Sequence, residues 1–195
     1  MIDNRSLSSP ETEQAIAAHI AEIIKLLGED VSREGLVKTP GRYARALLYA
    51  TRGYRQDIDA VINGAIFTHE GSNMVIVKDV EFYSLCEHHI LPFFGHVSIG
   101  YIPDGKTIGL SKLARIVDFY ARRLQVQERM TAQICHAVAD KLNAKGVIVY
   151  SEAHHLCMKM RGVEKQDSTT STIETVGEFA DSPSLRAEFF AALSR

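Results

Sequence analysis

The sequence has little of several features that would place a protein in a special class. It holds three cysteines in 195 residues, too few and too odd a number for a disulfide framework. Lys and Arg total 22 against 24 Asp and Glu, a formal net charge of −2, so we expect no nucleic-acid partner. It has no long apolar run, so we expect no transmembrane helix and no membrane partner.

Two further absences argue against other classes of protein. The first residues, MIDNRSLSSPETEQ, have neither a cationic start nor an apolar core, so we expect no secretory signal and a reducing, cytoplasmic location. No Walker-type glycine loop is present, which argues against a P-loop nucleotidase. The remaining composition, 46% hydrophobic and 24% charged, is that of an ordinary globular protein.

Residues 1–70 are predicted to form a helical N-terminal region. Ser9-Pro10 is typical of an N-cap followed by the first helical residue, and apolar residues follow at helical spacing up to Leu27. A second helix is predicted to begin at Thr39-Pro40. The residues before Pro10 are expected to be disordered.

Residues 71–195 have the pattern of an α+β domain. The predicted strands are 74–77, 80–85, 97–101, 147–150, 154–160 and 172–176. Two helices are predicted between the third and fourth strands, one with Ser111 as its N-cap and one starting near Glu128. A terminal helix begins at Ser182-Pro183. This order predicts an antiparallel sheet with the two central helices packed on one face.

Two short segments concentrate metal-binding side chains. They are Cys86-Glu87-His88-His89 and His154-His155-Leu156-Cys157. Zinc prefers thiolate and imidazole ligands. Cys86 and His89 are three residues apart, so one tight turn can aim both at one point. On a strand, His155 and Cys157 would share a face.

The spacing favours a catalytic metal site. Cys86, His89 and Cys157 would leave a fourth position open for water, which is typical of catalytic rather than structural zinc. The spacing leaves open which histidines bind the metal and which move protons. Cys135, on an apolar helix with no partner in the sequence, is interpreted as a small buried hydrophobe.

A second group of side chains suits an anion. Ser111-Lys112 lies at a predicted helix N-terminus with Arg115 one turn later, where free N–H groups, the helix dipole and two cations favour a phosphate chain. Arg161 follows the second metal-binding segment, and Arg42 lies at the start of the Thr39-Pro40 helix. Each charge alone would be an ordinary solvated side chain; together with a metal site they indicate function.

Glu128 has two interpretations. As an acidic residue in the first turn of a helix it is favoured by the helix dipole, which by itself accounts for it. Held in a pocket, the same carboxylate could accept two N–H bonds from the edge of a guanine.

With these residues collected, the chain resembles GTP cyclohydrolase I from Thr39-Pro40-Gly41-Arg42 to Gly177. The resemblance is carried by EFYSLCEHH at 81–89, GLSKLAR at 109–115, QVQER at 125–129, and HLC at 155–157 leading to Arg161-Gly162. It implies the tunnelling fold and a toroidal homodecamer of two pentamers with active sites at subunit junctions. It also implies conversion of GTP and water to 7,8-dihydroneopterin triphosphate and formate, the first step of folate or tetrahydrobiopterin biosynthesis.

The resemblance further implies a role for each residue. The zinc ligands would be Cys86, His89 and Cys157. His88 and His155 would be the acid–base pair, with Ser111 handling a proton in the later rearrangement. Glu128 and Gln127 would bind the guanine. The triphosphate would be held by Lys112, Arg115 and Arg161, with Arg42 reaching in from a neighbouring subunit.

Three other functions fit part of the pattern. A non-catalytic zinc-binding scaffold would need a saturated four-ligand site and gives Glu128 and His88 no reason to coexist. A nucleobase deaminase would need H-x-E and a later P-C-x-x-C, which the sequence lacks. A tunnelling-fold nitrile reductase would need a nucleophilic cysteine without zinc, against the intact C-x-x-H and H-x-C segments.

Overall fold

The computed structural model describes residues 9–194 of the chain. The helices are α1 (Pro10–Leu26), α2 (Thr39–Ala50), the 3-10 helix η2 (Arg52–Arg55), α3 (Ile58–Ile62), α4 (Leu110–Ala121), α5 (Gln127–Leu142), α6 (Leu156–Lys159), α7 (Glu178–Asp181) and α8 (Pro183–Leu193). The strands are β1 (Ile66–Thr68), β2 (Val75–Cys86), β3 (Pro92–Ile102), β4 (Lys106–Ile108), β5 (Leu124–Gln125), β6 (Gly146–His155) and β7 (Thr170–Gly177). The α+β class is confirmed; the expected disorder falls outside the described residues, apart from Ser9.

A five-stranded sheet in the order β5-β2-β3-β6-β7 is the centre of the fold. Its β2–β3, β3–β6 and β6–β7 pairs are antiparallel, whereas β5 runs parallel to β2 through Leu85↔Leu124 and Cys86↔Gln125. The expectation of a purely antiparallel sheet is corrected at this edge, because the chain leaving α4 runs alongside the end of β2. β1 and β4 form a separate two-stranded sheet.

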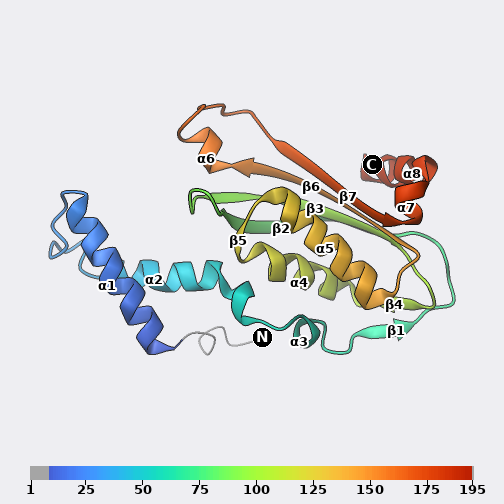
Figure 1. Cartoon of the computed structure of the whole chain (residues 1–195), viewed down its shortest axis with the longest axis horizontal. Coiled ribbons are helices and arrows are strands. Elements are labelled where there is room, and N and C mark those ends of the chain that lie inside the picture. The colour runs from blue at the N-terminus through green and yellow to red at the C-terminus, as the bar shows by residue number, and fades with distance from the viewer. Residues whose placement is uncertain (1–8, 195) are drawn as a thin grey trace.

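The two faces of the five-stranded sheet are covered by different helices (Figure 1). Side chains alternate along β6, so Val147 and Val149 face the core shared with α4 and α5, while Ile148 faces α8. Phe189 of α8 is fully buried in this second, smaller core. The predicted two-helix layer is therefore present, and α8 adds a partial cover on the opposite face.

Three local predictions need correction. Segments 74–77 and 80–85 are parts of one strand, β2, interrupted by a bulge between Val77 and Val80. The N-cap of α4 is Gly109, so Ser111 already lies within the helix. The predicted strand 154–160 ends at His155, opposite Phe93, and continues as α6. The next residue of β3 beyond Phe93 is Pro92, which has no N–H to extend the ladder.

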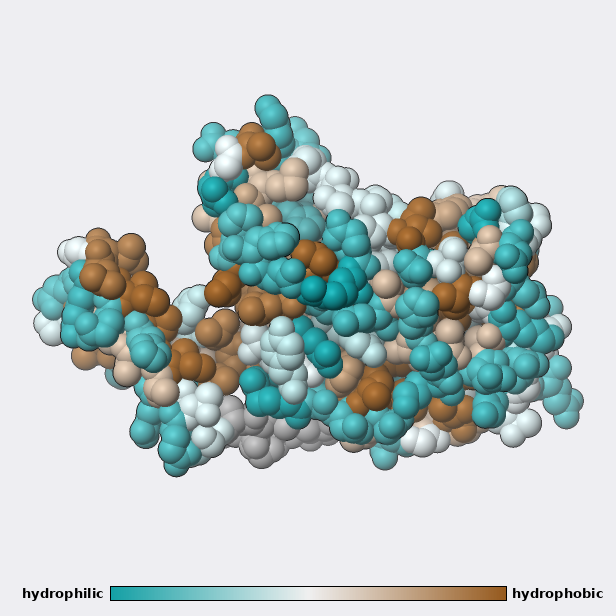
Figure 2. Space-filling model, in the orientation of Figure 1, coloured by the Kyte–Doolittle hydropathy of each residue, from teal (hydrophilic) through white to brown (hydrophobic). Residues whose placement is uncertain are grey.

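α1 and α2 form an arm that projects from the sheet domain (Figure 1). Its surface includes exposed apolar side chains, among them Leu26 and Leu27. Hydrophobic residues, in brown, gather on the arm at the left of Figure 2. The residues after the arm pack on the sheet domain, since β1 pairs with β4 across the expected boundary at residue 70. The division into two regions stays a prediction. Within residues 9–194, no helix has the length and apolar character needed to cross a membrane.

η2 fastens the arm to the end of α4. Arg52 is 8% exposed and its Nη2 lies 2.8 Å from Asp118 Oδ2. The amide of Gly53 donates to the carbonyl of Arg122 at 2.9 Å. A Cβ on Gly53 would lie 2.3 Å from the carbonyl oxygen of Phe119, so a glycine is required by this close approach.

We predict that Gly53→Ala destabilises the fold by about 1–3 kcal/mol, because the added methyl group forces two backbones apart. The measurement is chemical unfolding followed by circular dichroism. Gly41→Ala is the matched control: its Cβ would meet only Arg45 Nη1 at 3.5 Å, and alanine is favoured within a helix, so stability should hold or rise. Equal stability of both variants would contradict the requirement for glycine at position 53.

Candidate metal centre and active site

Three metal-binding side chains converge where β2 and β6 end. Cys86 is the last residue of β2, His89 lies in the turn that follows, and Cys157 lies in α6. Their candidate ligand atoms all lie within 4.8 Å of one another, and Cys86 Sγ is 3.7 Å from His89 Nδ1. The predicted set is brought together, although Cys157 reaches it from a helical turn and not from a strand face shared with His155.

A tight turn aims the first two ligands. The amide of Cys86 donates to the carbonyl of Leu91 at 2.8 Å, and the amide of Ile90 donates to the carbonyl of Cys86 at 2.8 Å. Ile90 has a φ of 54°, an uncommon conformation for a branched residue that the turn requires. Backbone hydrogen bonds thus close the segment that carries Cys86 and His89 into a tight turn.

The donor set fits a metal ion of borderline softness. Two thiols and one imidazole are the ligands that zinc prefers. Burial, and then the neighbouring Cys86 thiol, raise the pKa of Cys157, because two thiolates so close together repel each other. A cation between them would remove that repulsion. The geometry and chemistry therefore support a metal ion held by these three residues.

His155 is held beside the metal group (the candidate ligands Cys86, His89 and Cys157) by hydrogen bonds and ring stacking. Its Nε2 lies 2.8 Å from Gln127 Oε1, and its ring stacks on Phe93 with centroids 4.6 Å apart. Gln127 Nε2 donates to the carbonyls of Ser151 and Thr170 at 3.1 and 2.9 Å, which fixes the orientation of the amide. The network therefore assigns the hydrogen to Nε2 of His155 and leaves Nδ1 free.

This network gives Gln127 a role different from the expected contact with guanine. Gln127 is 1% exposed, and its amide is engaged with His155, Ser151 and Thr170. Burial lowers the pKa of His155, while the nearby Glu128 carboxylate acts in the opposite direction. Gln127 thus holds a neutral imidazole in place, and the exposed Glu128 beside it is the residue free to meet a ligand.

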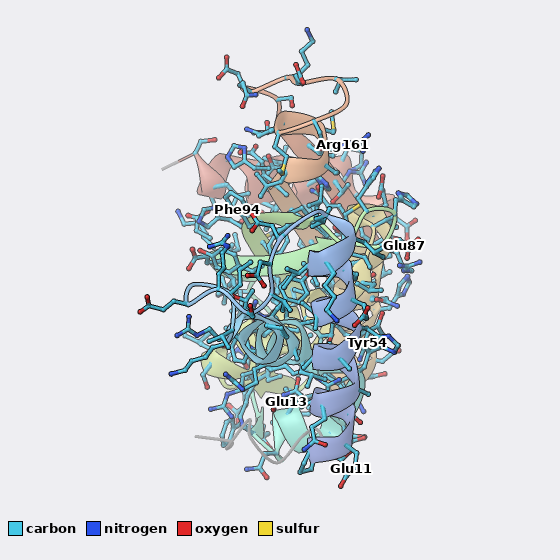
Figure 3. All side chains as sticks on the ribbon, turned by 90° about the vertical axis from the view of Figure 1, so that its left-hand side faces the viewer. Glu11, Glu13, Tyr54, Glu87, Phe94 and Arg161 are labelled. Atoms are coloured by element: carbon cyan, nitrogen blue, oxygen red, sulfur yellow. The ribbon has the colours of Figure 1, made fainter. Side chains whose placement is uncertain are left out.

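The remaining residues at this end of the sheet are more exposed. His88 Nε2 lies 3.8 Å from Glu87 Oε1. Both residues belong to the turn at residues 86–91, which we call the metal turn. Arg161 follows α6 and is close enough to Cys157 to lower the pKa of that thiol. Figure 3 looks onto this end of the molecule, with Arg161 above Glu87 and Tyr54 below it.

The structure separates the helix-start residues of the second predicted group from the metal ligands, whereas Arg161 lies near them. Ser111, Lys112 and Arg115 lie in the first turns of α4, whose length of about 18 Å separates its start from the end that leads to β5. Lys112 is 9% exposed and its Nζ donates to the carbonyl of Val61 at 3.3 Å. Arg42 is exposed on the arm. Within one chain, Ser111, Lys112 and Arg115 therefore lie away from the metal ligands.

Sequence reasoning missed three participants. Phe93 carries no signal beyond its place in an apolar strand. Glu87 and Arg129 stand inside the strings that carry the resemblance, but no role was expected for them. In the structure they form an ion pair, in which the Arg129 guanidinium lowers the pKa of Glu87.

Comparison with known proteins identifies the family. The profile of the family described as GTP cyclohydrolase I matches residues 16–194. The chain belongs to this family. It is 53% identical to GTP cyclohydrolase 1 2 of Pseudomonas aeruginosa, covering 92% of this chain and 99% of that protein. It is 54% identical to GTP cyclohydrolase 1 of Alkalilimnicola ehrlichii, covering 90% and 95%. For GTP cyclohydrolase 1 of Porphyromonas gingivalis the identity is 51%, covering 95% and 97%.

Membership of the GTP cyclohydrolase I family makes the chain an enzyme. It sets aside the scaffold, deaminase and nitrile reductase interpretations. The crystal structure of an archaeosine synthase QueF-like protein in the apo form is also similar, with a TM-score of 0.45 and 19% identity over 55% of this chain and 97% of that chain. We draw nothing about function from a likeness at that level.

Cys135 provides a test of which thiols belong to the site. It is fully buried, and burial raises its pKa to about 12. We predict that at pH 8 a thiol reagent modifies Cys157 in chelator-treated native protein and that metal protects it, whereas Cys135 reacts only after unfolding. Thiol titration with peptide mass mapping checks this. Modification of Cys135 at the rate of Cys157 would contradict the assignment.

Proposed function

We propose that this member of the GTP cyclohydrolase I family opens the imidazole ring of the guanine of GTP by zinc-dependent hydrolysis, giving 7,8-dihydroneopterin triphosphate and formate. The observation that carries the proposal is the convergence of Cys86, His89 and Cys157 beside His155 and Glu128. Such a site combines a metal position, an acid–base group and a carboxylate for the substrate. We propose the folate or tetrahydrobiopterin pathway as its context and the cytoplasm as its location.

The protein's own groups account for binding and proton movement. The zinc, when bound, supplies Lewis acidity that activates water at neutral pH. Burial favours the neutral form of His155 and Gln127 orients its ring, so the unprotonated Nδ1 can accept a proton during attack on guanine C8 and return it when the ring opens. His88, on the metal turn, is a second proton carrier. The carboxylate of Glu128 accepts N–H bonds from the guanine edge.

Binding of the triphosphate needs more than one chain in this proposal. Arg161 lies near the metal ligands, but Ser111, Lys112 and Arg115 lie at the other end of α4. We propose that a second copy brings these residues to the site and that Arg42 comes from a further copy. Ser111 then handles the proton of the later ribose rearrangement.

The edges of the sheet favour such an assembly. β7 forms one edge of the sheet. At the other edge β5 pairs only with Leu85 and Cys86, so within the described residues most of β2 has a neighbouring strand on one side only, where it pairs with β3. Unpaired edges are templates for pairing with another chain. We propose a tunnelling fold in which these edges meet in a homodecameric toroid of two pentamers, with residues 71–195 as the catalytic domain and 1–70 as the helical region.

The first test is incubation of the purified protein with GTP, with and without a zinc chelator, following formate and pterin by mass. We expect equal amounts of formate and dihydroneopterin triphosphate, lost on chelation and restored by zinc. Cys157→Ala should lose bound zinc and fall below about 1% of wild-type turnover, because a ligand is missing. Cys135→Ala is the matched control and should keep both. Bound zinc with unchanged GTP would refute the proposed reaction, and turnover by Cys157→Ala would refute the zinc site.

The shared site predicts recovery of activity in mixed assemblies. Lys112→Ala and Cys157→Ala should each be inactive alone. When the two are co-expressed with different tags, about a quarter of the sites in a closed ring should combine an intact metal group with an intact Lys112. Turnover of the doubly purified hybrid measures this. A hybrid as inactive as its parents would place both residues in the same chain's site.

A further inference from the structure

Arg129 takes no part in the proposed chemistry, yet its guanidinium joins the elements that carry it. Nη2 forms an ion pair with Glu87 in the metal turn and donates to the carbonyl of Leu124 at 3.4 Å. Nε donates to Gln125 Oε1 at 3.1 Å. One side chain thus connects the metal turn and β5 to the first turn of α5.

The partners of Arg129 are themselves fixed in place. The amide of Glu87 donates to the carbonyl of Gln125 at 3.0 Å. Gln125 is 2% exposed, and its Nε2 donates to the carbonyl of Tyr120 at 3.0 Å and to Gln133 Oε1 at 2.8 Å. The guanidinium therefore docks on β5, where Gln125 is held by the end of α4 and by the second turn of α5.

The elements that Arg129 joins carry different residues of the proposed site. The metal turn carries His88 and His89, while the first turn of α5 carries Glu128 immediately before Arg129. The other oxygen of Glu87, Oε1, lies 3.8 Å from His88 Nε2, so the carboxylate that binds Arg129 also faces His88. A shift of the turn relative to α5 would change the separation between the metal ligands and Glu128.

An ordinary surface ion pair does not join separate elements of a site, and the chain contains such a pair for comparison. Arg33 and Glu29 form an exposed pair at 2.9 Å within one short segment between α1 and α2. The Arg129–Glu87 pair spans 42 residues and joins two elements of the site. Exposed ion pairs contribute little to stability, so a surface pair can be removed with little effect. The two arginines therefore provide a matched comparison.

We propose that Arg129 is a positioning residue: through Glu87 and Gln125 it holds the metal turn at a fixed separation from Glu128. The planar guanidinium is suited to this because its N–H groups point in fixed directions at several acceptors, which a lysine ammonium does not reproduce. This inference rests on the proposed function, since it concerns the alignment of guanine with the metal group.

The kinetic test compares Arg129→Gln, Arg129→Lys, Glu87→Gln and the double variant Arg129→Gln/Glu87→Gln with Arg33→Gln. We expect Arg129→Gln to lower kcat by about 10–100-fold, as loss of a supporting partner does around metal sites, with the KM for GTP and the zinc content little changed. Arg129→Lys should recover only part of the loss. The double variant should be no slower than the slower single variant, because both remove one interaction. Arg33→Gln should match the wild type.

Hydrogen–deuterium exchange gives a readout independent of turnover. Exchange in residues 86–91 should be faster in Arg129→Gln and unchanged in Arg33→Gln. The proposal is overturned if Arg129→Gln keeps kcat within about twofold of the wild type, or if the two single losses multiply in the double variant. If Arg129→Gln folds poorly, Arg129→Lys and Glu87→Gln decide by the same criteria. A wild-type protein that leaves GTP unchanged overturns the proposed function itself, an outcome distinct from an active wild type with a normal Arg129 variant.

Discussion

The site depends on one constraint of the sheet: β2 and β6 both pair with β3 in antiparallel fashion and so run parallel to each other. Their carboxyl ends therefore lie at the same end of the sheet, one strand apart. β2 ends at Cys86 and β6 ends at His155, two residues before Cys157. Short continuations of two strands, rather than long loops, bring the thiols and His89 together. Phe93 lies between them on β3 and supplies the surface on which His155 stacks.

A second layer of organisation lies beneath the metal group. Gln127 and Gln125 are two buried amides at the start of α5 and just before it, and both are fully engaged. Gln127 fixes His155 from within the core, and Gln125 supports Arg129 at the surface. Buried polar groups are costly unless paired, so a satisfied network of this kind specifies one arrangement. His155 and the turn that carries Cys86 and His89 are therefore both held by side chains at the start of α5.

The division of the functional residues also follows from the topology. α4 carries the chain from the far end of the sheet back to β5, so about 18 Å of helix separates the residues at its start from those at its end. The open edges of the sheet offer a way for separate copies to bring them together. Assembly would then be a requirement of the chemistry and not only of stability.

The features that depend on neighbouring residues follow from the sequence alone. These are the α+β order, the caps at Ser9 and Ser182, whose side chains accept from nearby amides, and the donor types at Cys86, His89 and Cys157. Three further features depend on the packing of distant elements: Cys157 lies on a helical turn, Gln127 binds His155, and Arg129 reaches Glu87. Those contacts join segments far apart in the chain, and strand register and helix packing fix them. No local pattern of residue types encodes such distances.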